Sequence, residues 1–252
     1  MKKVTLLCGL LLVMSASIAT AAGVGIRWTE CIGDGGTANR NFACNVNTGS
    51  NVLVGTFELG AAGLAQTSGE EIIVDLASAS ATLPAWWQFK NVGTCRTGSL
   101  AIGAAPTANA ANCADWGGGL AGAGLGAYNI GGAAGDNTAR IVAASAVPPS
   151  GLQDLSGGTE YFAFTLAINN LKTVNGGCTG CQTAVCIVFN SLNMTTPILA
   201  NNVFLTGPSN GTDADFCTWQ GGAGVIVGGT PGCGAATPTK NTTWGAVKAM
   251  YH

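Results

Sequence analysis

A catalytic serine and a zinc site are the first possibilities to consider, because both usually depend on histidine. The sequence has one histidine, His252, and it is the last residue. A Ser-His-Asp triad and an H-E-x-x-H zinc site need a positioned imidazole, whereas terminal residues are commonly poorly ordered. Residues 207–211 match the G-x-S-x-G pattern around Ser209, but the proline, asparagine and glycines there indicate a loop rather than a strand, an elbow and a helix. The sequence therefore argues against a catalytic serine.

Carboxylate pairs could support glycoside hydrolysis without any histidine. The sequence places no two of them at the required separation, and acidic side chains are mostly exposed. The candidates are Glu58, Glu70, Glu71, Asp75, Glu160, Asp213 and Asp215. Segments 34–36 and 213–215 could supply oxygen ligands to Ca²⁺, but neither has the full twelve-residue loop pattern. We therefore expect no metal and no cofactor.

Cysteines are the most informative residues of the chain. It has ten, and all except Cys8 lie after residue 21. In an exported protein such cysteines indicate a disulfide framework. Short loops of about 14 to 19 residues, each worth roughly 3 kcal/mol in the chain-entropy model, favour three pairs. These pairs are Cys31 with Cys44, Cys95 with Cys113, and Cys217 with Cys233.

Three cysteines then remain in one cluster, Cys178, Cys181 and Cys186. A C-x-x-C redox pair would need a βαβ context, and a thiolate metal site would need a second group of ligands. We expect a Cys178–Cys181 bond in a glycine-rich turn, with Cys186 unpaired and buried. The alternative is a Cys178–Cys186 bond with Cys181 exposed, which would favour dimerisation.

The N-terminal sequence and the composition predict a protein that is exported from the cytoplasm. Lys2 and Lys3 precede an apolar run over residues 4–13, and Ala19-Thr20-Ala21 fits a cleavage site, so residues 1–21 read as a signal peptide. Only 9% of residues are charged, and no basic cluster exists, which excludes nucleic acid as a partner. No later stretch is apolar and long enough for a transmembrane helix. We expect a secreted or cell-surface protein.

Strand patterns recur along the rest of the chain. Residues 159–169 alternate with Phe162, Phe164, Leu166 and Ile168 on one face, and residues 184–190 alternate in the same way. We predict that these two strands form a hairpin. Other predicted strands, separated by turn signals, cover residues 51–59, 71–76, 86–91, 138–144 and 202–206. A short helix is possible over residues 244–251.

Many short strands with turns between them predict an all-β fold, an antiparallel β-sandwich of jelly-roll type that is held by disulfides and carries long glycine-rich loops. Residues 22–252 would form this single domain. The glycine- and alanine-rich segment 117–135 is expected to be a surface excursion, because ordering so much glycine is entropically costly.

Adjacent tryptophans mark a possible surface site. Trp86 and Trp87 would point to opposite faces of a strand, so one would enter the core. The other could stack on a sugar or meet a partner protein, or it could be covered by the glycine-rich excursion.

The chain contains several short motifs that include some of its cysteines and tryptophans: residues 27–31 (RWTEC), 41–44 (NFAC), 83–89 (LPAWWQF), 95–96 (CR), 178–181 (CTGC) and 243–251 (TWGAVKAMY). Together they resemble a group of uncharacterised secreted cysteine-containing proteins predicted from genomes of uncultured bacteria. The resemblance spans most of the chain after residue 21 and implies secretion, but it implies no activity.

Together these observations favour a non-enzymatic exported β-sandwich with a structural, adhesive or ligand-binding role, whose partner is a glycan or another surface protein. A carbohydrate-active enzyme with a carboxylate pair is one alternative. A subunit of an extracellular assembly is another, and a long unpaired edge strand would favour it.

Overall fold

The computed structural model describes residues 22–90, 93–106, 112–133, 135–209 and 214–222. The described chain is nearly all β, and its regular helices are three short 3₁₀ turns: η1 (Ala85–Trp87), η2 (Pro149–Gly151) and η3 (Leu199–Asn201). None of the described helices is long and apolar enough to cross a membrane. The predicted signal peptide and the predicted C-terminal helix lie outside the described residues.

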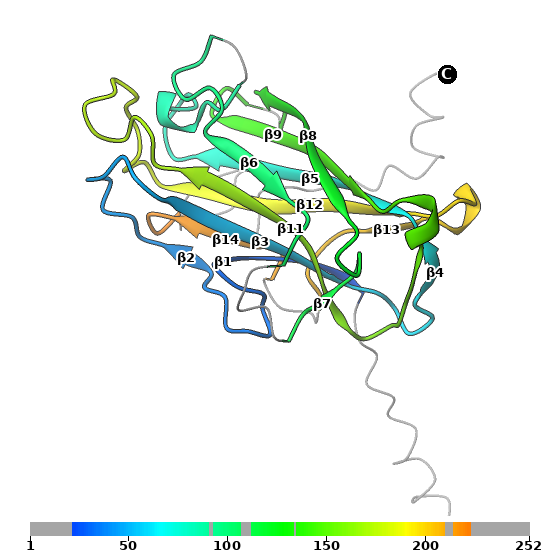
Figure 1. Ribbon diagram of the computed structural model, residues 1–252. Coiled ribbons are helices and arrows are strands. Elements are labelled where there is room, and N and C mark those ends of the chain that lie inside the picture. The colour runs from blue at the N-terminus through cyan, green and yellow to red at the C-terminus, as the bar shows by residue number, and fades with distance from the viewer. Residues whose placement is uncertain (1–21, 91–92, 107–111, 134, 210–213, 223–252) are drawn as a thin grey trace, which may run out of the picture.

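Two main sheets are layered on each other (Figure 1). The first contains β1 (Gly23–Trp28), β3 (Ser50–Glu58), β11 (Glu160–Asn169) and β6 (Leu100–Gly103) in that order, with β7 (Ala114–Asp115) beside β11. The second runs β2 (Asn39–Arg40), β14 (Phe216–Trp219), β12 (Val185–Thr195), β5 (Gly69–Ser78), β9 (Thr138–Ala146) and β8 (Gly122–Ile130), with β13 (Val203–Leu205) beside β12. A small ribbon joins β4 (Leu64–Thr67) to β10 (Gln153–Leu155). The predicted antiparallel, disulfide-linked all-β class is confirmed, and the jelly-roll detail stays a prediction.

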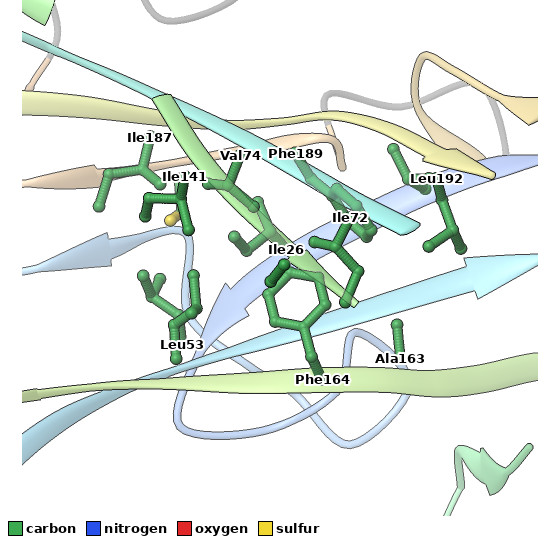
Figure 2. Packing of buried hydrophobic residues seen from close by; sticks show 14 of the residues in the cluster. Ile26, Leu53, Ile72, Val74, Ile141, Ala163, Phe164, Ile187, Phe189 and Leu192 are labelled. Carbon is green, nitrogen blue, oxygen red and sulfur yellow. The ribbon is translucent and has the colours of Figure 1, made fainter. Parts of the chain in front are cut away.

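The core fills the space between the two sheets. Figure 2 shows Leu53 and Phe164 pointing from one layer toward Ile72, Ile187 and Phe189 of the other. The rings of Phe164 and Phe189 meet edge to face with centroids 4.9 Å apart. Burial of such large apolar side chains is the main favourable contribution to folding.

The predicted hairpin over residues 159–190 is wrong, although both of its strands exist. β11 pairs with β3 and β6, whereas β12 pairs with β5, β13 and β14. The two strands therefore face each other across the core from opposite sheets. Alternation shows that a strand has one buried face, but a sandwich offers two sheets that satisfy this pattern equally well.

The four predicted core residues of β11 are all buried, but they do not share one face. Phe164, Leu166 and Ile168 belong to the central core. A register shift between Phe162 and Phe164 breaks the alternation, so Phe162 packs in a separate cluster with Val54 and the Cys31–Cys113 disulfide. A β-bulge of this kind reverses the faces of the residues on its two sides.

The predicted Cys31–Cys44, Cys95–Cys113 and Cys178–Cys181 bonds are wrong. The structure has Cys31–Cys113, Cys44–Cys181 and Cys95–Cys178, with Cα–Cα distances of 6.3, 6.0 and 5.7 Å. These bonds join residues 82, 137 and 83 positions apart, because the fold brings distant loops together at its ends. Nearness in sequence was therefore the wrong criterion.

Cys186 also departs from the prediction. It is buried as expected, but it is disulfide-bonded. It faces away from the central core and packs with Ala77 and Val188. Cys217 is fully buried, and burial raises the pKa of its thiol. Cys233, its predicted partner, lies outside the described residues.

Candidate functional site at the edge strand β8

The glycine-rich segment forms a strand where a surface excursion was predicted. β8 pairs antiparallel with β9 from Gly122 opposite Ala146 to Ile130 opposite Ala139. Leu125, Tyr128 and Ile130 face the core, and Tyr128 is buried. A register shift between Leu125 and Ala127 puts Leu125 and Tyr128, three residues apart, on the same side. The bulge therefore hides the alternation that would have revealed the strand.

The outer edge of β8 forms no ladder with another strand in the described residues. β8 pairs with β9 alone, and β6 of the other sheet lies close to β8 without pairing with it. Their sequence, GAGLGAYNI, contains neither a charge nor a proline. Natural proteins usually protect such an edge with charges, proline, bulges or a covering segment, and β8 has the bulge as its own protection. An edge of this kind can accept a strand from another chain.

A small hollow of about 210 Å³ follows this edge. It is lined by Lys90 and by five consecutive residues of β8, Leu125 to Asn129, with no residue of β9. A hollow lined by consecutive residues of one strand lies along its edge rather than on one face, because neighbouring side chains point to opposite faces. Lys90 is exposed and is the one charged group of the hollow.

The backbone that carries Lys90 is held against β8 by buried contacts. The Tyr128 hydroxyl donates a hydrogen bond to the carbonyl of Trp87, and the Phe89 and Tyr128 rings meet at 5.5 Å. Burial raises the pKa of Tyr128, so its hydroxyl keeps the proton that it donates. These contacts place Lys90 at the edge and leave its side chain in solvent.

Trp86 and Trp87, the predicted surface aromatics, are not available for binding. Trp86 and Trp87, which begin the predicted strand over residues 86–91, lie instead in η1, and both indoles are completely buried. They pack against each other at 5.1 Å and against Trp219 at 5.2 and 5.5 Å. A 3₁₀ turn does not send adjacent side chains to opposite faces of a sheet, so the strand geometry behind the prediction does not apply.

Arg96 completes this tryptophan cluster. Its guanidinium lies 3.7 Å from the centroid of a Trp86 ring and donates to the carbonyls of Trp86, Asn169 and Leu171. Burial lowers the pKa of Arg96 to about 10. A buried cation in such a site is stabilised by carbonyl dipoles and by the aromatic faces. The cluster is therefore structural.

A second hollow, of about 400 Å³, crosses the outer face of the larger sheet. It extends from Phe204 on β13, over β12, β5 and β9, to Gly124 and Gly126 on β8. Its apolar floor includes Ile73 and Val142, and the Phe204 side chain is 65% exposed. We call this hollow the outer groove. Sequence reasoning missed it because its lining comes from five strands, with one or two residues from most of them.

The polar residues on the outer face of the larger sheet form hydrogen bonds with one another. The Asn193 amide donates to Glu71 at 2.9 Å within the outer groove. Beyond the groove, Arg140 donates two 2.8 Å hydrogen bonds to the buried Asp75, which also accepts one from Asn190. The hydrogen bond to Asp75 raises the pKa of Arg140. Glu71 is the one carboxylate in the lining of the outer groove, whereas glycoside hydrolysis needs a pair.

The other candidate carboxylates have separate environments. Glu70 points inward and accepts a hydrogen bond from Ser145 at 2.6 Å, and burial raises its pKa to about 8. Glu58 and Glu160 are cross-strand neighbours, but both oxygens of Glu160 accept backbone N–H groups, from Ile32 and Gly33. Asp213 lies outside the described residues. These environments give Glu70 and Glu160 structural partners.

Two further sequence motifs also have structural surroundings. Ser209 is 2% exposed, so its hydroxyl is not presented to solvent as a nucleophile elbow would present it. Asp34 accepts hydrogen bonds from the backbone and side chain of Asn112 at 2.9 and 2.8 Å. Cys31 and Cys113 lie near Asp34, but they are bonded to each other and offer no thiolate to a metal.

Comparison with known proteins adds little. No protein-family model matches the chain, and no curated protein matches it. Among solved structures, it is similar to AggA, the major subunit of aggregative adherence fimbriae type I from Escherichia coli, at 8% identity over 80% of this chain and 94% of that one. The TM-score is 0.24, which is too low to establish a shared fold.

Proposed function

We propose that this protein is an exported structural subunit that assembles outside the cell through the open edge of β8. One observation carries the proposal. β8 has nine uncharged residues, and one edge of this strand is unpaired in the described part of the chain. Unpaired backbone N–H and C=O groups at a sheet edge form hydrogen bonds readily with an added strand.

The covalent framework supports an extracellular role. An all-β chain with several disulfides is typical of proteins that fold in oxidising surroundings. Removal of residues 1–21 on export, and one domain over residues 22–252, are parts of the same proposal. The predicted aromatic glycan site has no support, because both of its tryptophans are buried.

The test is the association state of residues 22–252, measured by sedimentation over a wide concentration range. We expect reversible, concentration-dependent assembly. The variant Gly122→Glu/Asn129→Glu adds two charges to the edge and should remain monomeric. Both positions are exposed, and a Cβ at Gly122 would meet nothing within 4 Å, so the variant should fold.

Ala146→Glu is the matched control. Ala146 is exposed and lies directly opposite Gly122, but it belongs to β9, which has strands on both sides. This variant should assemble like the unmodified chain. Assembly of the double variant at unchanged affinity, or a chain that stays monomeric at every concentration, would overturn the proposal.

A further inference from the structure

We propose that β8 accepts an extended segment of another chain that carries a carboxylate facing Lys90 and a large apolar side chain entering the outer groove. The inference rests on the proposed role of β8 as the joining edge, and it adds the chemistry of the segment that joins. Three observations carry it: the charge beside the edge, the bare glycines on β8, and the groove beyond them.

The charge argues for a segment other than a second β8. Lys90 lines the hollow along the edge, and it has no ion-pair partner among the described residues. Two antiparallel copies of β8 would bring two Lys90 ammonium groups toward each other, and β8 itself contains no carboxylate. Like charges at a strand pair are unfavourable, whereas opposite charges stabilise it. The segment that fits therefore carries an acidic residue.

The glycines make room for a side chain of the added strand. A Cβ at Gly124 would meet nothing within 4 Å, and one at Gly126 would meet only the backbone of Val142. On a sheet, a side chain packs against its cross-strand neighbours on the same face. Beside β8 those neighbours are glycines, so a large side chain can cross β8 and reach the floor of the outer groove.

The groove suits an apolar side chain. Gly124 and Gly126 form its end at β8, Ile73 and Val142 lie on its floor, and Phe204 stands at the far side. Its volume of about 400 Å³ is large enough to hold one large side chain with room to spare. Glu71 already accepts a hydrogen bond from Asn193, so the apolar residues are the main part of the groove that a ligand can contact.

The probes are fluorescent ten-residue peptides of alternating threonine and valine, with one leucine and one aspartate four residues apart, in both orders. Binding to residues 22–252 is followed by fluorescence anisotropy, with the protein kept below the concentration at which it associates. One of the two acidic peptides should bind. Replacing its aspartate by asparagine should weaken binding at least about fivefold, and added salt should weaken the acidic peptide more than the neutral one.

Variants separate the two contacts. Lys90→Glu should reverse the preference, so that a peptide with lysine in place of aspartate binds better than the original. Phe204→Ala should remove the preference for leucine over serine and leave the preference for aspartate unchanged. Both side chains are exposed, so neither change should impair folding. Ala38→Glu is the control and should change neither preference, because Ala38 is exposed and directly precedes β2, at the opposite end of the larger sheet from β8.

Hydrogen exchange locates the peptide. The outward amides of β8, which are not bonded to β9, should exchange quickly in the monomer and become protected with the acidic peptide. Protection of these outward amides before any peptide is added would show that the chain covers its own edge, and this would overturn the inference. Equal binding of the aspartate, asparagine and lysine peptides would also overturn it. Assembly that depends on β8 without any peptide binding would leave the proposed function standing and refute this inference alone.

Discussion

The tryptophan cluster and the β8 edge lie in one sandwich, yet they are built on opposite principles. Around Trp219, four aromatic side chains, a buried arginine and the Cys44–Cys181 disulfide constrain the same small volume. Along β8, the outward positions are glycines, alanine and asparagine, with no covalent link and no charge. The cluster therefore fixes the fold through burial, while the edge leaves backbone groups available to a partner. In the proposed function, stability and interaction therefore belong to different parts of the chain.

The largest expected effect comes from a substitution that disrupts the tryptophan cluster. Trp219 is fully buried, contacts Trp28, Phe42, Trp86 and Trp87, and donates its indole N–H to the carbonyl of Cys181 at 2.7 Å. Trp219→Ala should lower the free energy of unfolding by about 3–5 kcal/mol, because it leaves a large cavity. Phe204→Ala removes an exposed aromatic side chain and should change the free energy of unfolding by less than about 0.5 kcal/mol. Urea denaturation of both variants measures the difference, and similar losses would contradict the contrast between buried and exposed regions.

An intermediate effect concerns Glu70, which lies on β5 next to Ser145 of β9, one strand away from β8. Burial raises its pKa to about 8 in the folded protein from an ordinary value of 4.5. Between these two pH values the unfolded chain has lost the proton that the folded chain still holds. The unfolded state therefore binds fewer protons, and stability should fall as pH rises, by up to about 1.4 kcal/mol per pH unit.

Glu70→Gln should remove this slope, since the amide does not ionise. The free energy of unfolding, measured by urea denaturation at pH 5, 7 and 9, should decline with pH in the unmodified protein and decline much less in the variant. Glu71→Gln is the control, because Glu71 is the exposed neighbour on the same strand and its substitution should keep the slope. Identical pH profiles for Glu70→Gln and the unmodified chain would show that Glu70 is charged in the fold.

Local patterns in the sequence predicted the strands but not their partners. Alternation located β11 and β12, and strand candidates separated by turn signals located β3, β5, β9 and β13. It failed at β8, where a bulge and small side chains removed the pattern, and at Trp86, where a 3₁₀ turn buries adjacent residues together. Sheet membership and disulfide pairing depend on long-range packing, which no local spacing encodes.

The candidate site was even less accessible to prediction. The proposed role of Lys90 depends on Tyr128 and Phe89, which hold its loop against β8, and the outer groove exists because five strands lie side by side. Neither contact follows from residues that are close in sequence. The one relevant signal was the glycine-rich composition of residues 117–135, which indicated a region poor in side chains but not that it would be a sheet edge.

The smallest expected effects come from one substitution, glycine to alanine, made once in the core and once at the β8 edge. At Gly55 on β3, a Cβ would lie 2.4 Å from the ring of Phe164, which is fully buried and cannot move aside. Gly55→Ala should therefore destabilise the fold by about 1–3 kcal/mol through overpacking. At Gly124 on β8, a Cβ meets nothing within 4 Å. Gly124→Ala should instead stabilise the fold by about 0.4–1 kcal/mol, because alanine has less conformational freedom to lose on folding. Urea denaturation of the two variants side by side gives the signs directly. A loss at Gly124 as large as that at Gly55 would mean that β8 is already covered in solution, and the edge would then not be open to a partner strand.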